Sequence, residues 1–514
     1  MPGRVGLEFQ FTQPRRREAM RPDEESPMRI LVMGDLSGRG NRGVENAAEL
    51  AKRAIVSVDV DNFDKVLSRF APSLHLPAGN AAGSPVTIDF RRLEDFHPDR
   101  LYRDLSVFAA LRQTRSLLQD PASFAAAAAK LQQGVAPASG PDKPSAAATH
   151  AGAGEDAAAT LERLLGKKPE PTGAAPKPSA AQPVDIEGLI RHMVAPHIVP
   201  DAPPFQAQYV ASVDAAIGEQ MRMLLHHPEF QALESAWRAI RRLIAELEIG
   251  DRLKLYLLDV TRDELRADMH AAGGNPESSA LYRLLAQQGE APDGESWSLL
   301  VGNYTFAMQD EDVDLLAWLG AIASQAGGPF LAAADASVLG CRSVADTPDP
   351  RDWHAIEGEA GERWQALRQS AVAAWLGLAL PRILLRLPYG KRSDALEQFP
   401  FEELTAARDH EAYLWGNPAM ACALLIGRTF LERGWDMEPG DERDVGDLPA
   451  HVYEHDGEKR LQACAEAYLS ERAGEAMLAR GLLPFLSLKN QNAARLLRFQ
   501  SLADPAQALA GPWR

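Results

Sequence analysis

The sequence is divided by a long stretch that cannot form a core. Residues 131–183 consist mainly of Ala, Pro, Gly, Ser and Lys, as in VAPASGPDKPSAAATHAGAGE. Burial of so few apolar side chains cannot offset the entropy that is lost when the backbone is ordered. We therefore expect a disordered linker over 131–183, an N-terminal strand arm and tether over 1–27, and folded domains over 28–130 and 184–514.

One island in this linker has helical spacing. Within residues 157–166, Leu161, Leu164 and Leu165 lie at positions i, i+3 and i+4, on one face of a helix. So short a helix is marginally stable in isolation. Two interpretations stay open: residual helix in an Ala-rich linker, or a short motif that folds into the groove of a partner.

Residues 28–130 are typical of a small α/β domain. The predicted elements are a strand at 29–33, a helix that begins after Asp61 or Asn62, a strand at 86–90, and helices at 98–118 and 121–130. Apolar residues recur at helical spacing in the first helix and predict its buried face: Phe63, Val66, Leu67 and Phe70.

Residues 184–514 begin with helices and continue as alternating strands and helices. Helices are predicted at 206–225, 228–247, 311–324 and 418–431, and strands at 253–260, 297–301 and 329–333. This order predicts a larger, layered α/β domain with an N-terminal helical segment. The helical spacing predicts a set of core residues: Leu224, Phe230, Leu233, Trp237 and Ile240. Adjacent histidines cannot share a metal on a helix, so His226 and His227 are expected to cap or pack.

The N-terminal arm alternates apolar and polar residues over 4–12. Val5, Leu7, Phe9 and Phe11 therefore lie on one face of a predicted strand. A strand on a tether must pair with a sheet edge. It either closes the sheet of its own domain or adds to the sheet of a neighbouring protomer.

Composition excludes several classes of function. The formal net charge of −17 disfavours nucleic-acid binding, because phosphate backbones would be repelled. The chain has 3 cysteines, Cys341, Cys422 and Cys464, whose wide spacing predicts neither a disulfide framework nor a cysteine metal site. Lacking an apolar run long enough to span a bilayer and a secretory leader, the chain is expected to be cytoplasmic, without membrane insertion.

Catalytic motifs are also missing from the sequence. The loop at 34–40 follows a strand and is rich in glycine, but it lacks the Lys-Ser/Thr pair of a phosphate loop and the spacing of a dinucleotide loop. We expect a protein that is not an enzyme, with neither catalytic residues nor a cofactor or metal. A nucleotide-binding enzyme remains a remote alternative.

Several segments together resemble the contractile sheath proteins of bacterial type VI secretion systems. RVGLEF (4–9), LVMGDLSGR (31–39), VDVDNFDKVL (58–67) and RLEDFHPD (92–99) resemble the small subunit, TssB or VipA. HHPEFQALESAWR (226–238), LVGNY (300–304), LPRILLRLPYG (380–390) and YLWGN (413–417) resemble the large subunit, TssC or VipB. The resemblance implies a natural fusion of both subunits, in which structural roles fall to the residues of these motifs: Gly34, Asp35, Asn62, Phe63, Trp237, Pro381, Arg382, Arg386, Pro388, Tyr389, Gly390, Trp415, Gly416 and Asn417.

The same resemblance implies a structural function. Sheath subunits assemble by strand exchange into hexameric rings or six-start tubes around an inner tube of Hcp-like protein, and they meet baseplate proteins. An AAA+ disaggregase, ClpV, recycles the contracted sheath through a short helix. The strand at 4–12 would then be the exchanged strand, and the helix at 157–166 the ClpV-binding helix.

Two departures from the family keep an alternative open. The resemblance ends near residues 486–502, where the large sheath proteins of the family extend further, and the segment at 434–448 is short. The chain is therefore expected either to be a sheath protomer whose TssC-like part is shortened at its C-terminus, or to be an accessory protein. Such an accessory would cap, nucleate or regulate the sheath without polymerising.

Overall fold

The computed structural model describes residues 22–77, 85–132, 206–287, 296–405, 409–455 and 457–513. Two predicted interaction segments, the arm at 4–12 and the island at 157–166, lie outside these residues. Their candidate side chains are Val5, Leu7, Phe9, Phe11, Leu161, Leu164 and Leu165.

The described residues fall into two compact units, one of which is a small group of helices within 109–216. It contains α4 (Ala109–Gln119), α5 (Phe124–Gln132) and the first part of α8 (Gln206–Leu225). The Phe124 and Tyr209 rings meet edge to face with 5.9 Å between their centroids. An ion pair joins Arg115 Nε of α4 to Asp214 Oδ1 of α8 at 2.5 Å, so that α8 has an aromatic contact with α5 and a charged contact with α4.

The other unit, residues up to 108 together with 217–514, is built on a mixed sheet. Its central strands pair in parallel, and the strands at both edges pair antiparallel with their neighbours. The strand order is β11 (Asp444–Val445), β15 (Ala494–Leu496), β14 (Leu482–Ser487), β8 (Leu376–Leu380), β7 (Phe330–Ala334), β6 (Leu299–Phe306), β1 (Met28–Gly34), β5 (Leu253–Asp259) and β2 (Val56–Val58).

Helices cover both faces of this sheet. One core contains Leu31 and Met33 of β1 together with most of α12 (Asp310–Ala326). Ile30 and Val32 point to the opposite face because side chains alternate along a strand. The helix α14 (Pro418–Arg433) also packs on the sheet, and its buried residues do not belong to the core around α12. The other main helices of this unit are α9 (Pro228–Glu246), α10 (Arg262–Ala271), α11 (Ala280–Leu285), α13 (Gly358–Gln369) and α15 (Glu471–Ala479).

Smaller elements surround the sheet in the same unit. The short helices are α1 (Arg39–Arg42), α2 (Phe63–Phe70) and α3 (Pro98–Asp104). Three antiparallel pairs join β3 (Ser73–Leu76) to β4 (Val86–Asp89), β9 (Ile383–Leu384) to β10 (Trp415–Gly416), and β12 (Val452–His455) to β13 (Glu458–Leu461).

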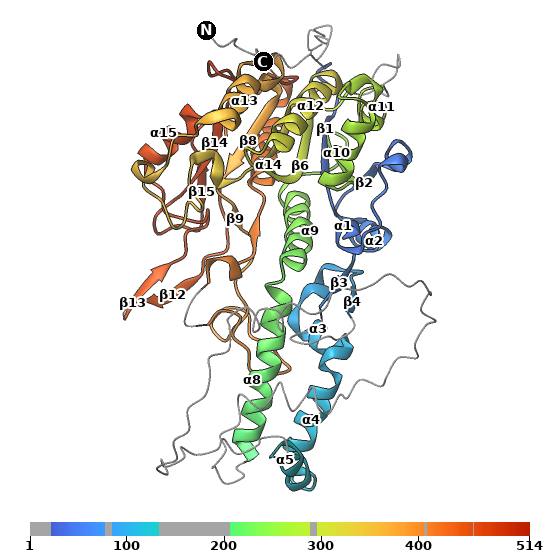
Figure 1. The fold of residues 1–514 in the computed structure, drawn as a ribbon, viewed down its shortest axis with the longest axis vertical. Coiled ribbons are helices and arrows are strands. Elements are labelled where there is room, and N and C mark those ends of the chain that lie inside the picture. Colours follow the sequence, from blue (N-terminus) through green and yellow to red (C-terminus); the bar gives the residue numbers. More distant parts are fainter. Residues whose placement is uncertain are drawn as a thin grey trace, which may run out of the picture. The chain divides into compact units, whose positions relative to one another are not determined.

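The strand β1 shows how the segments before and after the linker are joined. It lies between β5 and β6, and Figure 1 shows it beside β6. Val32 has Leu257 as its neighbour on one side and Val301 on the other. The α/β class is confirmed, but β1 and β2 from the segment 28–130 belong to the main sheet with strands from beyond the linker. A strand that is apolar on both faces has to lie in a sheet covered on both faces, which the main sheet provides, whereas β3 and β4 pair only with each other.

Most predicted elements are present with small differences in their bounds. The predicted helix at 98–118 is divided into α3 and α4, because Leu105 is extended with φ −81° and ψ 134°. Asn62 stands at the N-cap of α2, but its side chain accepts from the Asp59 backbone N–H rather than capping the helix. His227 does cap α9: its Nδ1 accepts from the Glu229 N–H at 3.3 Å.

The predicted core residues of α8 and α9 are confirmed. All are at most 8% exposed: Leu224, Phe230, Leu233, Trp237 and Ile240. Among the helices of the described residues, none is both long enough and apolar enough to cross a membrane.

Candidate functional site

The glycine-rich loop after β1 is closed by two carboxylates. Asp35 Oδ1 and Oδ2 accept from the Arg39 and Gly40 N–H groups, both at 2.9 Å. Asp259, at the end of β5, accepts from the Leu36 N–H at 2.8 Å and from the Ser37 hydroxyl at 2.8 Å. Burial raises the pKa of Asp259, although the Ser37 hydroxyl opposes this shift.

This arrangement does not suit a nucleotide. A phosphate-binding loop presents free backbone N–H groups to the ligand. Here the N–H groups of Leu36, Ser37, Arg39 and Gly40 already donate to the carboxylates of Asp35 and Asp259. The geometry therefore gives the remote nucleotide-binding alternative no support.

Trp237 of α9 joins the segment that resembles TssC to the segment that resembles TssB. Its side chain is fully buried, and its indole N–H donates to the Leu36 carbonyl at 2.9 Å. The edges of the Phe63 and Phe70 rings of α2 meet it, with centroid distances of 5.9 and 5.7 Å. The predicted buried face of α2 thus packs on a helix that lies beyond the linker.

A second aromatic group strengthens the same contact. Phe90 and Phe96 stack with 4.0 Å between their centroids, and Phe230 of α9 meets both rings edge-on at 5.8 and 5.6 Å. The face of α9 that carries Phe230 and Trp237 is therefore buried against residues from before the linker. The two segments share one apolar core.

Arg386 lies in a buried ionic cluster that we call the Arg386 cluster. Its Nε donates to Glu234 Oε1 at 2.9 Å, and its Nη1 donates to Glu403 Oε2 at 2.7 Å. The Tyr389 N–H donates to Glu403 Oε2 at 2.7 Å, and Arg238 Nη2 donates to the Tyr389 hydroxyl at 3.1 Å. The cluster ties α9 to the segment that follows β9.

Burial and the neighbouring charges shift the pKa values of several groups in this cluster. Burial would raise the pKa of Glu403, but the charge of Arg386 and the hydrogen bonds from His226, Arg386 and Tyr389 together outweigh burial and lower the pKa to about 2. Burial lowers the pKa of Arg386, and Glu234 and Glu403 more than reverse that, so its pKa lies well above the usual value. Burial raises the pKa of Tyr389 to about 12. At neutral pH Glu403 is therefore a paired anion and the Tyr389 hydroxyl is neutral.

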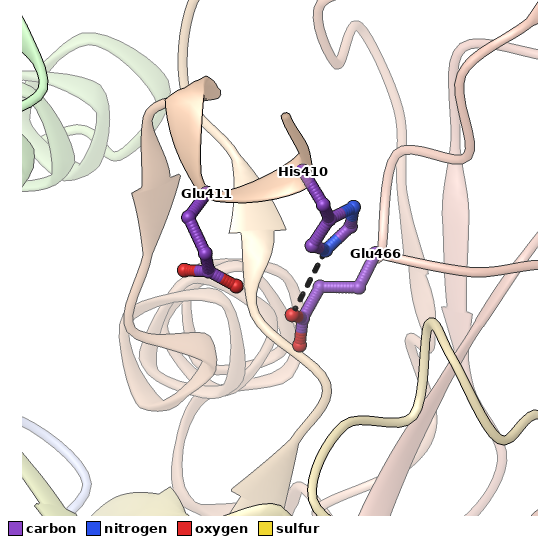
Figure 2. Close-up of side chains that lie close together, drawn as sticks. All are labelled: His410, Glu411 and Glu466. Atoms are coloured by element: carbon purple, nitrogen blue, oxygen red, sulfur yellow. Dashed lines mark hydrogen bonds and ion pairs between the residues drawn. The ribbon is translucent and has the colours of Figure 1, made fainter. Parts of the chain in front are cut away.

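Arg382 lies at the centre of a second cluster, the Arg382 cluster. Its guanidinium donates to both carboxylate oxygens of Glu411, at 2.9 and 2.8 Å, and to Glu466 Oε1 at 2.5 Å. His410 Nε2 lies 3.3 Å from the same Glu466 oxygen (Figure 2). His410 also stacks on Trp415 of β10, with 4.8 Å between the ring centroids. Trp415 thus lies beside this cluster.

His410, Glu411 and Glu466 offer ligand atoms within 4.8 Å of one another, and so we tested them as a metal site. The test fails because Arg382 already donates to both carboxylates, and its cation occupies the place of a metal ion. The hydrogen bond from Arg382 lowers the pKa of Glu411. Burial would raise the pKa of Glu466, but bonds from His410 and Arg382 lower it. These residues fit a salt-bridge cluster.

Asn417 connects β10 to the main sheet. Its Oδ1 accepts from the Ala419 N–H at 2.9 Å and so caps α14, while its Nδ2 donates to the Tyr304 carbonyl of β6 at 2.9 Å. Gly416 lies in β10 opposite Ile383, and a Cβ there would come within 2.6 Å of Leu385. The motif at 413–417 thus fixes the start of a helix that covers the sheet.

The remaining motif residues also occupy structural positions. Gly34 ends β1, the Gly390 N–H donates to the Asp394 carbonyl at 2.8 Å, and Pro381 and Pro388 are buried. Sequence reasoning missed Glu234 and Glu403. Glu234 could have been found, since it lies four residues after Phe230 and three before Trp237, on the apolar face of α9. Glu403 lies outside any named helix or strand and gives no such signal.

Comparison with known families agrees with this joined architecture. The VipB family, described as a tail sheath N-terminal domain, matches residues 207–503. The VipA family of type VI secretion systems matches residues 3–137. The chain belongs to the type VI secretion sheath family. The two matches in one chain identify it as a fusion of the small and large sheath subunits.

A curated relative supports the same assignment. The type VI secretion system sheath protein TssC1 of Pseudomonas aeruginosa is 34% identical over 309 residues, which cover 58% of this chain and 61% of the relative. The VipA match contains β1 and β2, and the VipB match contains the other strands of the main sheet. A single sheet of the sheath protein is thus built from both families.

Proposed function

We propose that this chain is a fused protomer of a type VI secretion contractile sheath. The supporting observation is the position of β1: a strand from the VipA match lies between β5 and β6 from the VipB match. The contacts of Trp237 and the Arg386 cluster are those of a rigid building block, in which the polar groups are paired within the chain.

Fusion has a physical advantage for such a building block. A covalent connection makes pairing of the two halves intramolecular, which raises the effective concentration of each for the other. It also fixes their ratio at one to one. We propose that protomers assemble into rings or a six-start tube around an Hcp-like inner tube on a baseplate, and that assembly occurs in the cytoplasm.

Strand exchange by the N-terminal arm is the proposed assembly mechanism. Replacing Leu7, Phe9 and Phe11 with Asp is expected to abolish assembly while the protomer stays folded, because three charges would enter the face that a neighbour buries. Sedimentation measures assembly, and circular dichroism measures the fold.

A matched control carries the same number of new charges elsewhere. Val44, Val60 and Val452 are 49%, 61% and 52% exposed, so their replacement with Asp buries no charge in the protomer. This control is expected to assemble like the unmodified protein. Wild-type sedimentation of the Leu7, Phe9 and Phe11 variant would disprove strand exchange by the arm.

The leucine island is proposed as the contact with a ClpV-like disaggregase. A peptide of residues 157–168 is expected to bind the N-terminal domain of the cognate ATPase, since three leucines on one helical face suit an apolar groove. Replacing Leu161, Leu164 and Leu165 with Ala should abolish binding in fluorescence anisotropy. Equal affinity of the two peptides would reduce the island to linker.

A further inference from the structure

A pocket of about 220 Å³ lies where the loop after β1, the chain before β2 and the end of α2 come together. Three arginines from these segments line it, together with one carboxylate and an apolar wall. The lining residues used below are Arg39, Arg53, Arg69, Asp259, Val56 and Phe70. An arginine-rich pocket is unexpected in a chain whose formal net charge is −17.

Two of the arginines are held in place by the protein. Arg53 is fully engaged: its Nη1 donates to Glu264 Oε2 at 2.7 Å and to the Asp259 carbonyl at 2.9 Å, and its Nη2 also binds Glu264. Arg39 Nη1 donates to Asp259 Oδ2 at 3.2 Å, and its Nε lies 3.5 Å from Glu264 Oε1. The side chains of Arg39 and Arg53 are only 18% and 11% exposed, so both are fixed before any ligand arrives.

The third arginine has donors to spare. Arg69, in the last turn of α2, is exposed, and no carboxylate of the described chain forms an ion pair with it. Within the same described residues, Nη2 of Arg39 donates to no acceptor. Asp259 is occupied by Leu36, Ser37 and Arg39, and cannot serve Arg69 as well without losing these bonds.

The carboxylates around the pocket are already engaged. Asp259 and Glu264 bind Arg39 and Arg53, and Asp35 accepts from the backbone of the loop. Arg69, at the exposed side, is the lining arginine with no carboxylate partner among the described residues. Guanidinium groups match the oxygens of phosphate and carboxylate in geometry and charge, and they bind them with charge-assisted hydrogen bonds.

We propose that this pocket binds a small oxyanion of the phosphate type, held between Arg39 and Arg69. The volume of the pocket accommodates a phosphate group, and Val56 and Phe70 form an apolar wall that strengthens the ionic contact. Side chains hold this anion, in contrast to the backbone of the loop at 34–40, which is already closed by Asp35 and Asp259. The proposal does not depend on sheath assembly.

Titration calorimetry of the full-length protein with inorganic phosphate tests the proposal, at a constant ionic strength set with chloride. We expect saturable binding to one site per chain. Replacing Arg69 with Gln should weaken binding about tenfold or more, since it removes a charge-assisted contact. Arg69 is exposed and supports no carboxylate, so this variant is expected to fold normally.

The matched control is Arg472→Gln. Arg472 is also an exposed arginine on a helix, α15, and it lies outside the pocket. This variant should bind phosphate like the unmodified protein, whereas Arg39→Lys should bind more weakly because it loses the planar guanidinium. Absence of saturable binding by the wild type, or equal affinity of Arg69→Gln and Arg472→Gln, would overturn the proposal.

Discussion

Replacing Arg386 with Met is expected to lower the free energy of unfolding by about 3–5 kcal/mol, because buried Glu403 loses its arginine and Glu234 keeps only Arg238. Glu234 and Glu403 are at most 1% exposed, and the side chain of Arg386 is 8% exposed. Burial of the Glu403 carboxylate without its arginine costs more than the ion pair contributed. Urea denaturation, followed by tryptophan fluorescence, measures the loss.

The control for this variant is Arg495→Met. Arg495 and Asp444 form a bidentate pair at 2.6 Å, but both side chains are 48% exposed. Solvent screens such a pair, so its loss should cost only about 0–1 kcal/mol. Adding Glu403→Gln to Arg386→Met should recover part of the stability, because the unpaired charge of Glu403 is removed. Equal losses in Arg386→Met and Arg495→Met would contradict the account.

The same cluster predicts a dependence on pH. Glu403 has a pKa of about 2 in the folded protein, below the ordinary value of 4.5. A lowered pKa stabilises the folded state above pH 4.5, and this contribution is lost as the pH falls toward 2. In Arg386→Met the buried Glu403 carboxylate lacks its arginine partner, so it should take up a proton at a higher pH than in the wild type. The stability difference between wild type and variant should therefore shrink as the pH is lowered from 7 to 4.

Replacing Trp237 with Ala should cost about 3–5 kcal/mol, as expected for a fully buried aromatic side chain. The variant loses the contacts with Phe63 and Phe70 and leaves the Leu36 carbonyl without its donor. Since these partners all precede the linker, the damage should appear there. Hydrogen exchange is expected to increase over residues 30–36 and 63–70.

Trp318→Ala provides the matched control. Trp318 is also fully buried, in the core around α12. Its replacement with Ala is expected to lower the free energy of unfolding by a similar amount. Its effect on exchange should be largest in α12 rather than at 63–70. Trp237→Phe keeps most of the apolar volume but still removes the indole donor, which should cost about 1–3 kcal/mol. Unchanged protection of 63–70 in Trp237→Ala would argue against a shared core.

Local patterns in the sequence predict the elements well. The apolar run at 29–33 is observed as β1, Met28–Gly34, and the predicted helix at 418–431 is observed as α14, Pro418–Arg433. For both elements, the composition or periodicity of a few neighbouring residues is enough to predict the secondary structure. The helix at 311–324 likewise extends only slightly, to Asp310–Ala326.

The pairing of strands could not be predicted in the same way. Nothing in residues 28–34 indicates that the strand at 253–259 lies beside them, because a buried parallel strand has no local feature that names its neighbour. The same reasoning explains the site. Arg382 and Arg386 were identified by their motif, whereas Glu403 and Glu466 became visible only through contacts across the fold.

Negative-stain electron microscopy of the purified full-length protein tests the central claim, that the fused chain is a sheath protomer, most directly. Because segments of both families are folded into one sheet, the chain should need no second sheath protein to assemble. The account predicts hollow tubes or cogwheel-shaped rings. Monodisperse particles with the 55.9 kDa mass of one chain would contradict it and favour an accessory that binds a conventional sheath.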